Sequence, residues 1–302
     1  MTIRFGVSPI AWINDDMPEL GAETSLQQVL QDAQAIGFVG IELGGRFPKA
    51  PESLKPLLDT YSLDLVGGWY SASLLTRTAQ EEIEALKPHL ALLKAMNCSV
   101  FIIAETSNAI HGQRETPLQV RPHLTEAEWR IFGQRLTEVA DYIYAQGLKF
   151  AYHYHLGTVV QDNQDLAAFF AFTGPRVGIT LDTGHAVLGG IDPFDVIDHH
   201  ADRIQHVHAK DIRQSIFDET AGQSDSFLNG VLAGMFTVPG DGSIDFARLF
   251  SALANIGYDG WIIVEAEQDP KRADPRLYAQ RGLDTLKHLS QVAGLSEVVL
   301  NP

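Results

Sequence analysis

The tetrapeptide Ala35-Ile36-Gly37-Phe38 has a close counterpart near the other end of the chain, Asn255-Ile256-Gly257-Tyr258. In both, a helical pattern ends at a glycine, and an apolar residue then begins a strand pattern. Glycine is favoured at this point because it readily adopts the left-handed backbone conformation that ends many helices. Gly147 follows a third helical pattern in the same way. The sequence therefore predicts a helix-to-strand unit that is used repeatedly.

Short apolar, β-branched runs alternate with longer helical patterns along the whole chain. The expected strands are 3–9, 38–43, 63–69, 99–104, 149–155, 177–182, 204–210 and 261–267. The helical patterns between them include 25–36, 79–96, 126–145, 164–172 and 245–256. Eight such units in 302 residues favour an α/β fold, a parallel sheet closed into a (β/α)8 TIM barrel.

A doubly wound open sheet is the alternative fold. It would require a glycine-rich phosphate-binding turn after an early strand, and Gly6-Val7-Ser8-Pro9 lacks that pattern. No Pro- or Ser-rich linker divides the chain, so residues 1–302 are expected to form a single barrel domain. The longest irregular stretch, 212–243, follows the seventh strand and is expected to be lid-like, with a short helix over 226–235.

The composition excludes several classes of protein. The net charge of −16 disfavours binding to nucleic acid or to an anionic membrane, and a neutral polyol is the expected kind of substrate. No apolar run approaches the roughly 18 residues of a membrane span, and residues 1–6 do not resemble a signal peptide. Cys98 is the only cysteine, which excludes an intrachain disulfide and fits the cytoplasm.

Polar residues gather at the ends of the later strands. In a barrel strand alternate residues point inward, and catalysis occurs at the carboxyl ends. The inward positions of strands five to eight hold His153, His155, Asp182, His206, His208, Lys210, Glu265 and Glu267. His185 follows the sixth strand, and Glu42 and Glu105 end the second and fourth strands. Because so many buried ionisable groups are costly unless paired or bound to metal, the set predicts a functional site at the barrel mouth.

This mixture of imidazole and carboxylate groups indicates the kind of site. It suits Mn²⁺, Co²⁺, Fe²⁺ or Zn²⁺ better than Ca²⁺. A thiolate site is not supported, since no cysteine lies near these residues, and a serine nucleophile is not supported, since no G-x-S-x-G sequence occurs. We therefore expect a divalent metal held by histidine and carboxylate side chains.

Three motifs resemble the xylose isomerase-like, or endonuclease IV-like, barrel superfamily. They are Leu181-Asp182-Thr183-Gly184-His185, His206-Val207-His208-Ala209-Lys210-Asp211 and Val264-Glu265. The resemblance implies that Asp182, His208 and Glu265 bind a metal. The superfamily usually adds a glutamate from the fifth strand, where this chain has His153, so the fourth ligand stays open, with His153 expected in that place.

Further blocks in the same order along the chain resemble the inosose dehydratase family of inositol catabolism. They are residues 6–18 (GVSPIAWINDDMP), 40–45 (GIELGG), 152–161 (YHYHLGTVVQ), 236–242 (FTVPGDG) and 264–270 (VEAEQDP). The resemblance implies dehydration of 2-keto-myo-inositol to a trihydroxycyclohexane-dione, with Mn²⁺ or Co²⁺ as the metal.

That reaction requires a base for the proton beside the ketone and an acid for the departing hydroxyl. The inward-facing His155, Lys210, Glu267 and His185 supply both kinds of group. An imidazole with a pKa of about 6.5 is a serviceable base at neutral pH, so His155 is expected to be the base. Lys210 or Glu267 is then expected to donate a proton to the leaving hydroxyl or to hold it. Four more residues are expected to line the pocket without binding metal, namely Trp12, Glu42, Trp69 and Glu105.

Other functions share parts of this pattern. A keto-sugar or keto-inositol isomerase or epimerase would use the same metal but return the proton to carbon, and His153 in place of a glutamate disfavours it. An abasic-site endonuclease would need a D-x-H element where this chain has Asp241-Gly242-Ser243. A metal-bound sugar-binding protein without turnover is a third alternative. The physiological metal and any association into a homo-oligomer are left open by the sequence.

Overall fold

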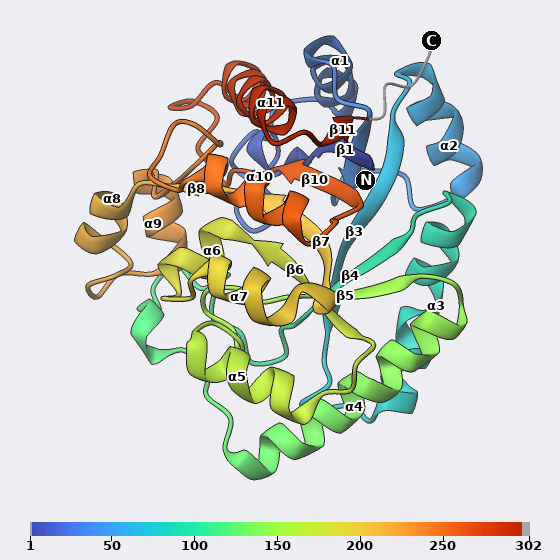
Figure 1. The fold of residues 1–302 in the computed structure, drawn as a ribbon, viewed down its shortest axis with the longest axis vertical. Helices are drawn as coiled ribbons and strands as arrows, with labels where there is room; N and C mark the ends of the chain where they lie inside the picture. Colours follow the sequence, from blue (N-terminus) through green and yellow to red (C-terminus); the bar gives the residue numbers. More distant parts are fainter. Residues whose placement is uncertain (1, 298–302) are drawn as a thin grey trace.

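Eight parallel strands close into a barrel in the computed structural model, which describes residues 2–297 (Figure 1). They are β1 (Thr2–Val7), β2 (Gly40–Leu43), β3 (Asp64–Ala72), β4 (Val100–Glu105), β5 (Lys149–His153), β6 (Val177–Asp182), β7 (Ile204–Ala209) and β10 (Gly260–Val264). Each strand pairs with the next in this order, and β10 pairs with β1, where Phe5 lies opposite Ile262. A short strand, β11 (Ser296–Glu297), pairs with the start of β1. The predicted TIM barrel is confirmed.

The helices form a layer around these strands (Figure 1). They include α1 (Leu26–Ile36), α2 (Pro51–Thr60), α3 (Ala79–Ala95), α4 (Glu126–Ala145), α5 (Asn163–Phe172), α6 (Thr183–Leu188), α7 (Pro193–His200), α10 (Phe246–Asn255) and α11 (Pro275–Val292). Short 3-10 helices lie at η1 (Pro9–Ala11), η2 (Leu118–Val120) and η3 (Ala201–Arg203). Gly37, Gly147 and Gly257 have φ angles of 96°, 94° and 71°, as the repeated unit predicts.

The two faces of each strand pack differently. Ile179 and Leu181, on alternate positions of β6, are fully buried in the large apolar core that also contains helix residues such as Leu136. The inward face is apolar where the strands begin, because Val66, Trp261 and Ile263 form a separate buried cluster there. Alternation continues this inward series beyond Ile263 to residue 265, which places the Glu265 side chain toward the carboxyl end of the barrel.

The segment 212–243 is more regular than the sequence indicated. It contains the antiparallel pair β8 (Asp211–Ile212) and β9 (Phe236–Thr237), helix α8 (Gln214–Glu219) and helix α9 (Phe227–Ala233). The expected short helix is therefore confirmed as α9, and the description of the whole stretch as irregular is wrong. The reason is a set of contacts between residues far apart in the sequence. Asp211 is buried and its carboxylate accepts hydrogen bonds from the backbone N–H groups of Gly240, Gly242 and Ile244 at 3.2, 3.0 and 2.9 Å.

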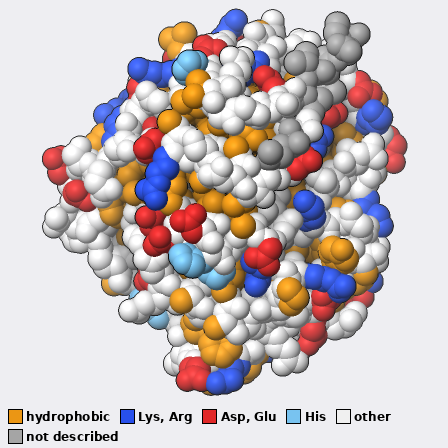
Figure 2. Space-filling view, viewed as in Figure 1, with side chains coloured by type: hydrophobic (Ala, Val, Ile, Leu, Met, Phe, Trp, Pro, Cys, Tyr) orange, Lys and Arg blue, Asp and Glu red, His pale blue; other side chains and the backbone are white. Residues whose placement is uncertain are grey.

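The surface carries mixed charge. Acidic, basic and apolar side chains are interspersed over the face seen in Figure 2. Of the helices within residues 2–297, none has both the length and the apolar character needed to cross a membrane.

Candidate active site

A cavity of about 250 Å³ lies at the carboxyl ends of the barrel strands. This is the end at which TIM barrels carry out catalysis. Among the residues that line it are five that the strand alternation placed inward, His153, His155, His208, Glu265 and Glu267. The strand ends therefore bring together side chains that are far apart in the sequence.

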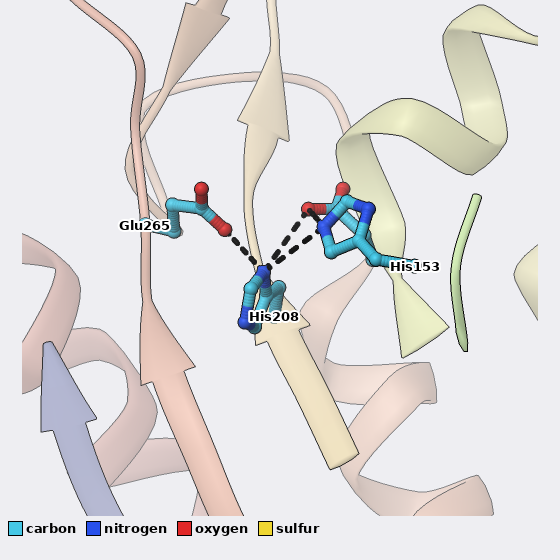
Figure 3. Close-up of side chains that lie close together, drawn as sticks. His153, His208 and Glu265 are labelled. Carbon is cyan, nitrogen blue, oxygen red and sulfur yellow. Dashed lines mark hydrogen bonds and ion pairs between the residues drawn. The ribbon is translucent and has the colours of Figure 1, made fainter. Parts of the chain in front are cut away.

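Four of the predicted metal ligands meet on one side of this cavity. His153, Asp182, His208 and Glu265 each offer one donor atom, and these atoms all lie within 4.8 Å of one another. His208 Nδ1 is 3.2 Å from His153 Nε2 and 3.6 Å from Asp182 Oδ2, and it also contacts Glu265 Oε2. Figure 3 shows the His208 ring between Glu265 and His153. The structure thus places His153 from β5 beside the other three predicted ligands.

The donor atoms of this group fit a divalent cation. Asp182 Oδ2 and Glu265 Oε2 are buried and approach His208 Nδ1, but neither makes a well-aligned hydrogen bond within residues 2–297. Burial lowers the pKa of His208, but Glu265 and Glu42 outweigh it and raise that pKa well above its ordinary value. A cation bound here would take the place of the additional proton, because metal ligands bind in their deprotonated forms. Two carboxylates and two imidazoles form a set typical of transition-metal sites.

A second buried group adjoins the first. Glu267 Oε1 accepts hydrogen bonds from Lys210 Nζ at 2.7 Å and from His185 Nε2 at 3.2 Å. His185 carries its proton on Nε2 because its Nδ1 accepts from the backbone N–H of Leu156 at 3.3 Å. His155 has the opposite arrangement, since its Nδ1 donates to the carbonyl of Leu156 at 2.7 Å. The Nε2 lone pair of neutral His155 is therefore left free, 4.0 Å from Glu267 Oε1.

The charges of this second group follow from their surroundings. Burial lowers the pKa of His155 well below its ordinary value, and nearby His185 and His111 lower it further. Burial also lowers the pKa of Lys210, but Asp182 and the two neighbouring glutamates outweigh burial and raise that pKa above its ordinary value. His155 is consequently a neutral imidazole, and Lys210 is an ammonium ion.

Lys210 joins the two groups. Its Nζ lies 3.3 Å from Asp182 Oδ2 and 3.5 Å from Glu265 Oε1, as well as contacting Glu267. The Asp-Thr-Gly-His motif explains how this buried lysine is accommodated. A Cβ atom on Gly184 would lie 2.7 Å from Lys210 Cγ, so a glycine is required there.

Of the four residues expected to line the pocket, some lie at the cavity and others do not. Trp69 lines the cavity with its ring edge toward His153, at a centroid distance of 5.3 Å. Glu42 also lines it. Trp12, in contrast, does not line this cavity. It is buried in the core, where its indole N–H donates to Asp32 at 3.0 Å.

Glu105 is likewise not among the residues that line the cavity. Its carboxylate is fully buried and accepts from the backbone N–H groups of Leu74 at 2.5 Å and Ser107 at 2.8 Å. Glu105 therefore joins the ends of neighbouring strands. Strand alternation alone does not distinguish these backbone contacts from contact with a ligand.

Several expected strands end earlier than the sequence indicated, and some of them carry predicted site residues. β5 ends at His153 and β10 ends at Val264, so His155, Glu265 and Glu267 lie in the loops just beyond the barrel strands. All three side chains nevertheless line the cavity. β5 ends early because the backbone after His153 turns locally, with the N–H of His155 donating to the carbonyl of Val160 at 3.0 Å.

Asp16 and His111 also line the cavity, although neither lies at an inward position of a predicted strand. His111 Nε2 is 3.9 Å from Asp16 Oδ1, and its ring centroid is 5.0 Å from that of His155. Burial, together with Glu267, raises the pKa of Asp16 to about 7. Asp16 belongs to the block 6–18 already singled out, which was a usable signal. His111 lies in the connection between β4 and α4, where no periodic pattern marks it.

The fold and this site define a TIM barrel with a candidate metal site, formed by His153, Asp182, His208 and Glu265, at the carboxyl ends of its strands. The sequence model described as "Xylose isomerase-like TIM barrel" matches residues 30–289. An inosose dehydratase of Lacticaseibacillus casei is 41% identical over 298 residues, which cover 97% of this chain and 100% of the relative. The rhizopine catabolism protein MocC of Rhizobium meliloti is 40% identical over 294 residues, covering 97% and 90%.

The chain belongs to the xylose isomerase-like TIM barrel family and, within it, to the inosose dehydratase family. A solved structure of L-ribulose 3-epimerase matches the fold with a TM-score of 0.69 at 18% identity, covering 97% of this chain and 96% of that one. At that identity the likeness concerns the fold alone.

Proposed function

We propose that this protein is a metal-dependent hydro-lyase that removes water from 2-keto-myo-inositol to give a trihydroxycyclohexane-dione, as a step of inositol catabolism. The observation that carries the proposal is that His153, His208 and Glu265 of the four-residue group line the same cavity as the neutral His155. Glu267 also lines this cavity, and the charged Lys210 is hydrogen-bonded to it. A dehydration needs both groups, because it stabilises negative charge on an oxygen and also moves two protons.

Four residues would hold the metal, namely His153, Asp182, His208 and Glu265. When bound, a divalent ion supplies Lewis-acid polarisation of the substrate ketone, which favours loss of the neighbouring proton. We propose Mn²⁺ or Co²⁺, because mixed nitrogen and oxygen ligands suit these ions and no cysteine is near.

The side chains of the second group perform the proton transfers. His155 Nε2 takes the proton from the carbon beside the ketone, and the C–H electrons form an enolate. The hydroxyl on the next carbon then leaves as water with a proton from Lys210, while the electron pair of the enolate forms the new carbon-carbon double bond. The enol that results rearranges to the dione. Glu267 holds Lys210 and His185 in place through hydrogen bonds of 2.7 and 3.2 Å.

The test is incubation of metal-reconstituted protein with 2-keto-myo-inositol. The expected product has lost the mass of one water and develops the absorbance of an enone or enol. Asp182→Ala should yield no product and no bound metal. A product of unchanged mass with a new configuration would assign an epimerase or isomerase, and binding without turnover would assign a sugar-binding protein.

A further inference from the structure

A third buried group lies beside the candidate metal site and shares His208 with it. Glu42 Oε1 is 2.9 Å from His206 Nε2 and 3.0 Å from His208 Nε2. All three side chains are buried, with 6%, 0% and 3% of their surface exposed. Glu42 is the penultimate residue of β2 and the two histidines are alternate residues of β7, so they approach one another across the barrel interior.

The hydrogen bonds determine which nitrogen of His208 carries a proton. An ionised carboxylate can only accept hydrogen bonds. His208 must therefore donate from Nε2 to Glu42, which leaves the lone pair of the neutral ring on Nδ1. That nitrogen is the one which lies 3.2 Å from His153 Nε2 and contacts Glu265.

His206 fixes the carboxylate in turn. The Nε2 atoms of His206 and His208 contact the same oxygen of Glu42, Oε1. The centroids of the two rings are 5.1 Å apart. A hydrogen bond from a second histidine keeps this oxygen from turning toward the cavity. Partners of this kind commonly set the orientation and tautomer of a metal-binding histidine.

We propose that Glu42, supported by His206, is a positioning residue that holds His208 with Nδ1 directed at the metal, and that it does not bind the substrate. This rests on the metal site of the proposed function. It replaces the expectation that Glu42 contacts substrate, because its oxygen nearest the centre is already shared by two histidines.

The first test is made on the unaltered protein. With ¹⁵N-labelled histidine and Zn²⁺ as a diamagnetic probe, two-bond ¹H–¹⁵N correlations report which nitrogen of each ring is protonated. The expected result is a proton on Nε2 of His208 in the zinc-loaded protein. A proton on Nδ1 of His208 would overturn the proposal, even if every variant failed to fold.

The second test compares variants by Mn²⁺ titration calorimetry. Glu42→Leu removes the acceptor and should weaken Mn²⁺ binding by about 10- to 100-fold, the usual effect of losing such a partner. Glu42→Gln keeps an acceptor oxygen and should lie between Glu42→Leu and the parent. Glu105→Gln is the matched control, a buried strand-end glutamate that contacts backbone N–H groups, and should bind Mn²⁺ as the parent does.

The outcomes separate this proposal from the proposed function. Parental affinity in both Glu42 variants would overturn the positioning role while leaving the metal site intact. Two Mn²⁺ ions per chain in the parent, with one lost in Glu42→Leu, would make Glu42 a ligand and also overturn it. Absence of Mn²⁺ binding by the parent would instead refute the metal dependence of the proposed function, and the positioning role with it.

Discussion

Replacement of His155 tests the assignment of the proposed base most directly. In the parent, His155 Nδ1 lies 2.7 Å from the carbonyl oxygen of Leu156. In His155→Asn the side-chain amide N–H should occupy the place of Nδ1 and keep this hydrogen bond, while the Nε2 lone pair is removed. His155→Gln does the opposite. Its side-chain amide reaches the position of Nε2 but does not replace the hydrogen bond from Nδ1 to the carbonyl of Leu156. The pair separates loss of the base from loss of the local anchor.

The expected loss follows from the surroundings of His155. General bases contribute about 10²- to 10⁴-fold to rate, and we expect both variants to lose kcat within this range. Glu267 is a poor replacement, because its Oε1 already accepts from Lys210 and His185 and lies 4.0 Å from the missing nitrogen. Mn²⁺ affinity should stay near that of the parent, since His155 is outside the ligand group.

The assay is exchange of the substrate proton beside the ketone with deuterated solvent, followed by mass spectrometry alongside dehydration. Both reactions should fall together in His155→Asn. Exchange at the parental rate in His155→Asn would refute the assignment, and the role of base would pass to Glu267. Loss of metal from the variant would show instead that the substitution had disturbed the ligand group.

Three further predictions concern other parts of the molecule. Glu265→Ala should abolish bound metal in elemental analysis with the fold retained by circular dichroism; full metal content would exclude Glu265 as a ligand. Trp12→Phe should lower the free energy of unfolding by about 1–3 kcal/mol in urea titrations, because the hydrogen bond to buried Asp32 is lost, whereas an altered KM alone would place Trp12 in the pocket. Burial lowers the pKa of His89 from 6.5 to about 4, so the stability gained from its neutral form is complete above pH 6.5 and is lost as the pH falls toward 4. The unfolding free energy of the parent should therefore drop more steeply over this range than that of His89→Gln, by up to about 1.4 kcal/mol per pH unit, and parallel curves would contradict it.

Most of the barrel could be predicted from local sequence. The glycines at 37, 147 and 257 have the positive φ angles that end helices, and the expected boundaries of β6 and α4 match the structure. These features are local, because they depend on backbone conformation and on the alternation of side chains along one strand. The order of segment 212–243 was not predictable in this way, since it depends on Asp211 binding backbone N–H groups about 30 residues later.

The sequence predicted which polar side chains converge at the strand ends, and it predicted their contacts less well. Alternation placed His153, Asp182, His208 and Glu265 on the inner face, and the structure brings their donor atoms within 4.8 Å of one another. Trp12 and Glu105 were expected in the pocket because they follow or end strands. A position at a strand end does not reveal whether a side chain contacts the backbone, the core or a ligand.

The sequence by itself determined the repeated strand-helix unit, the direction of the side chains and the chemical kind of the site. These are encoded at separations of a few residues, where the backbone fixes relative positions. Only the tertiary structure decided which nitrogen of each histidine is free and which carboxylates are already engaged. Glu42 and His208 are 166 residues apart, and their hydrogen bond exists only because closure of the barrel brings β2 and β7 to opposite sides of one interior.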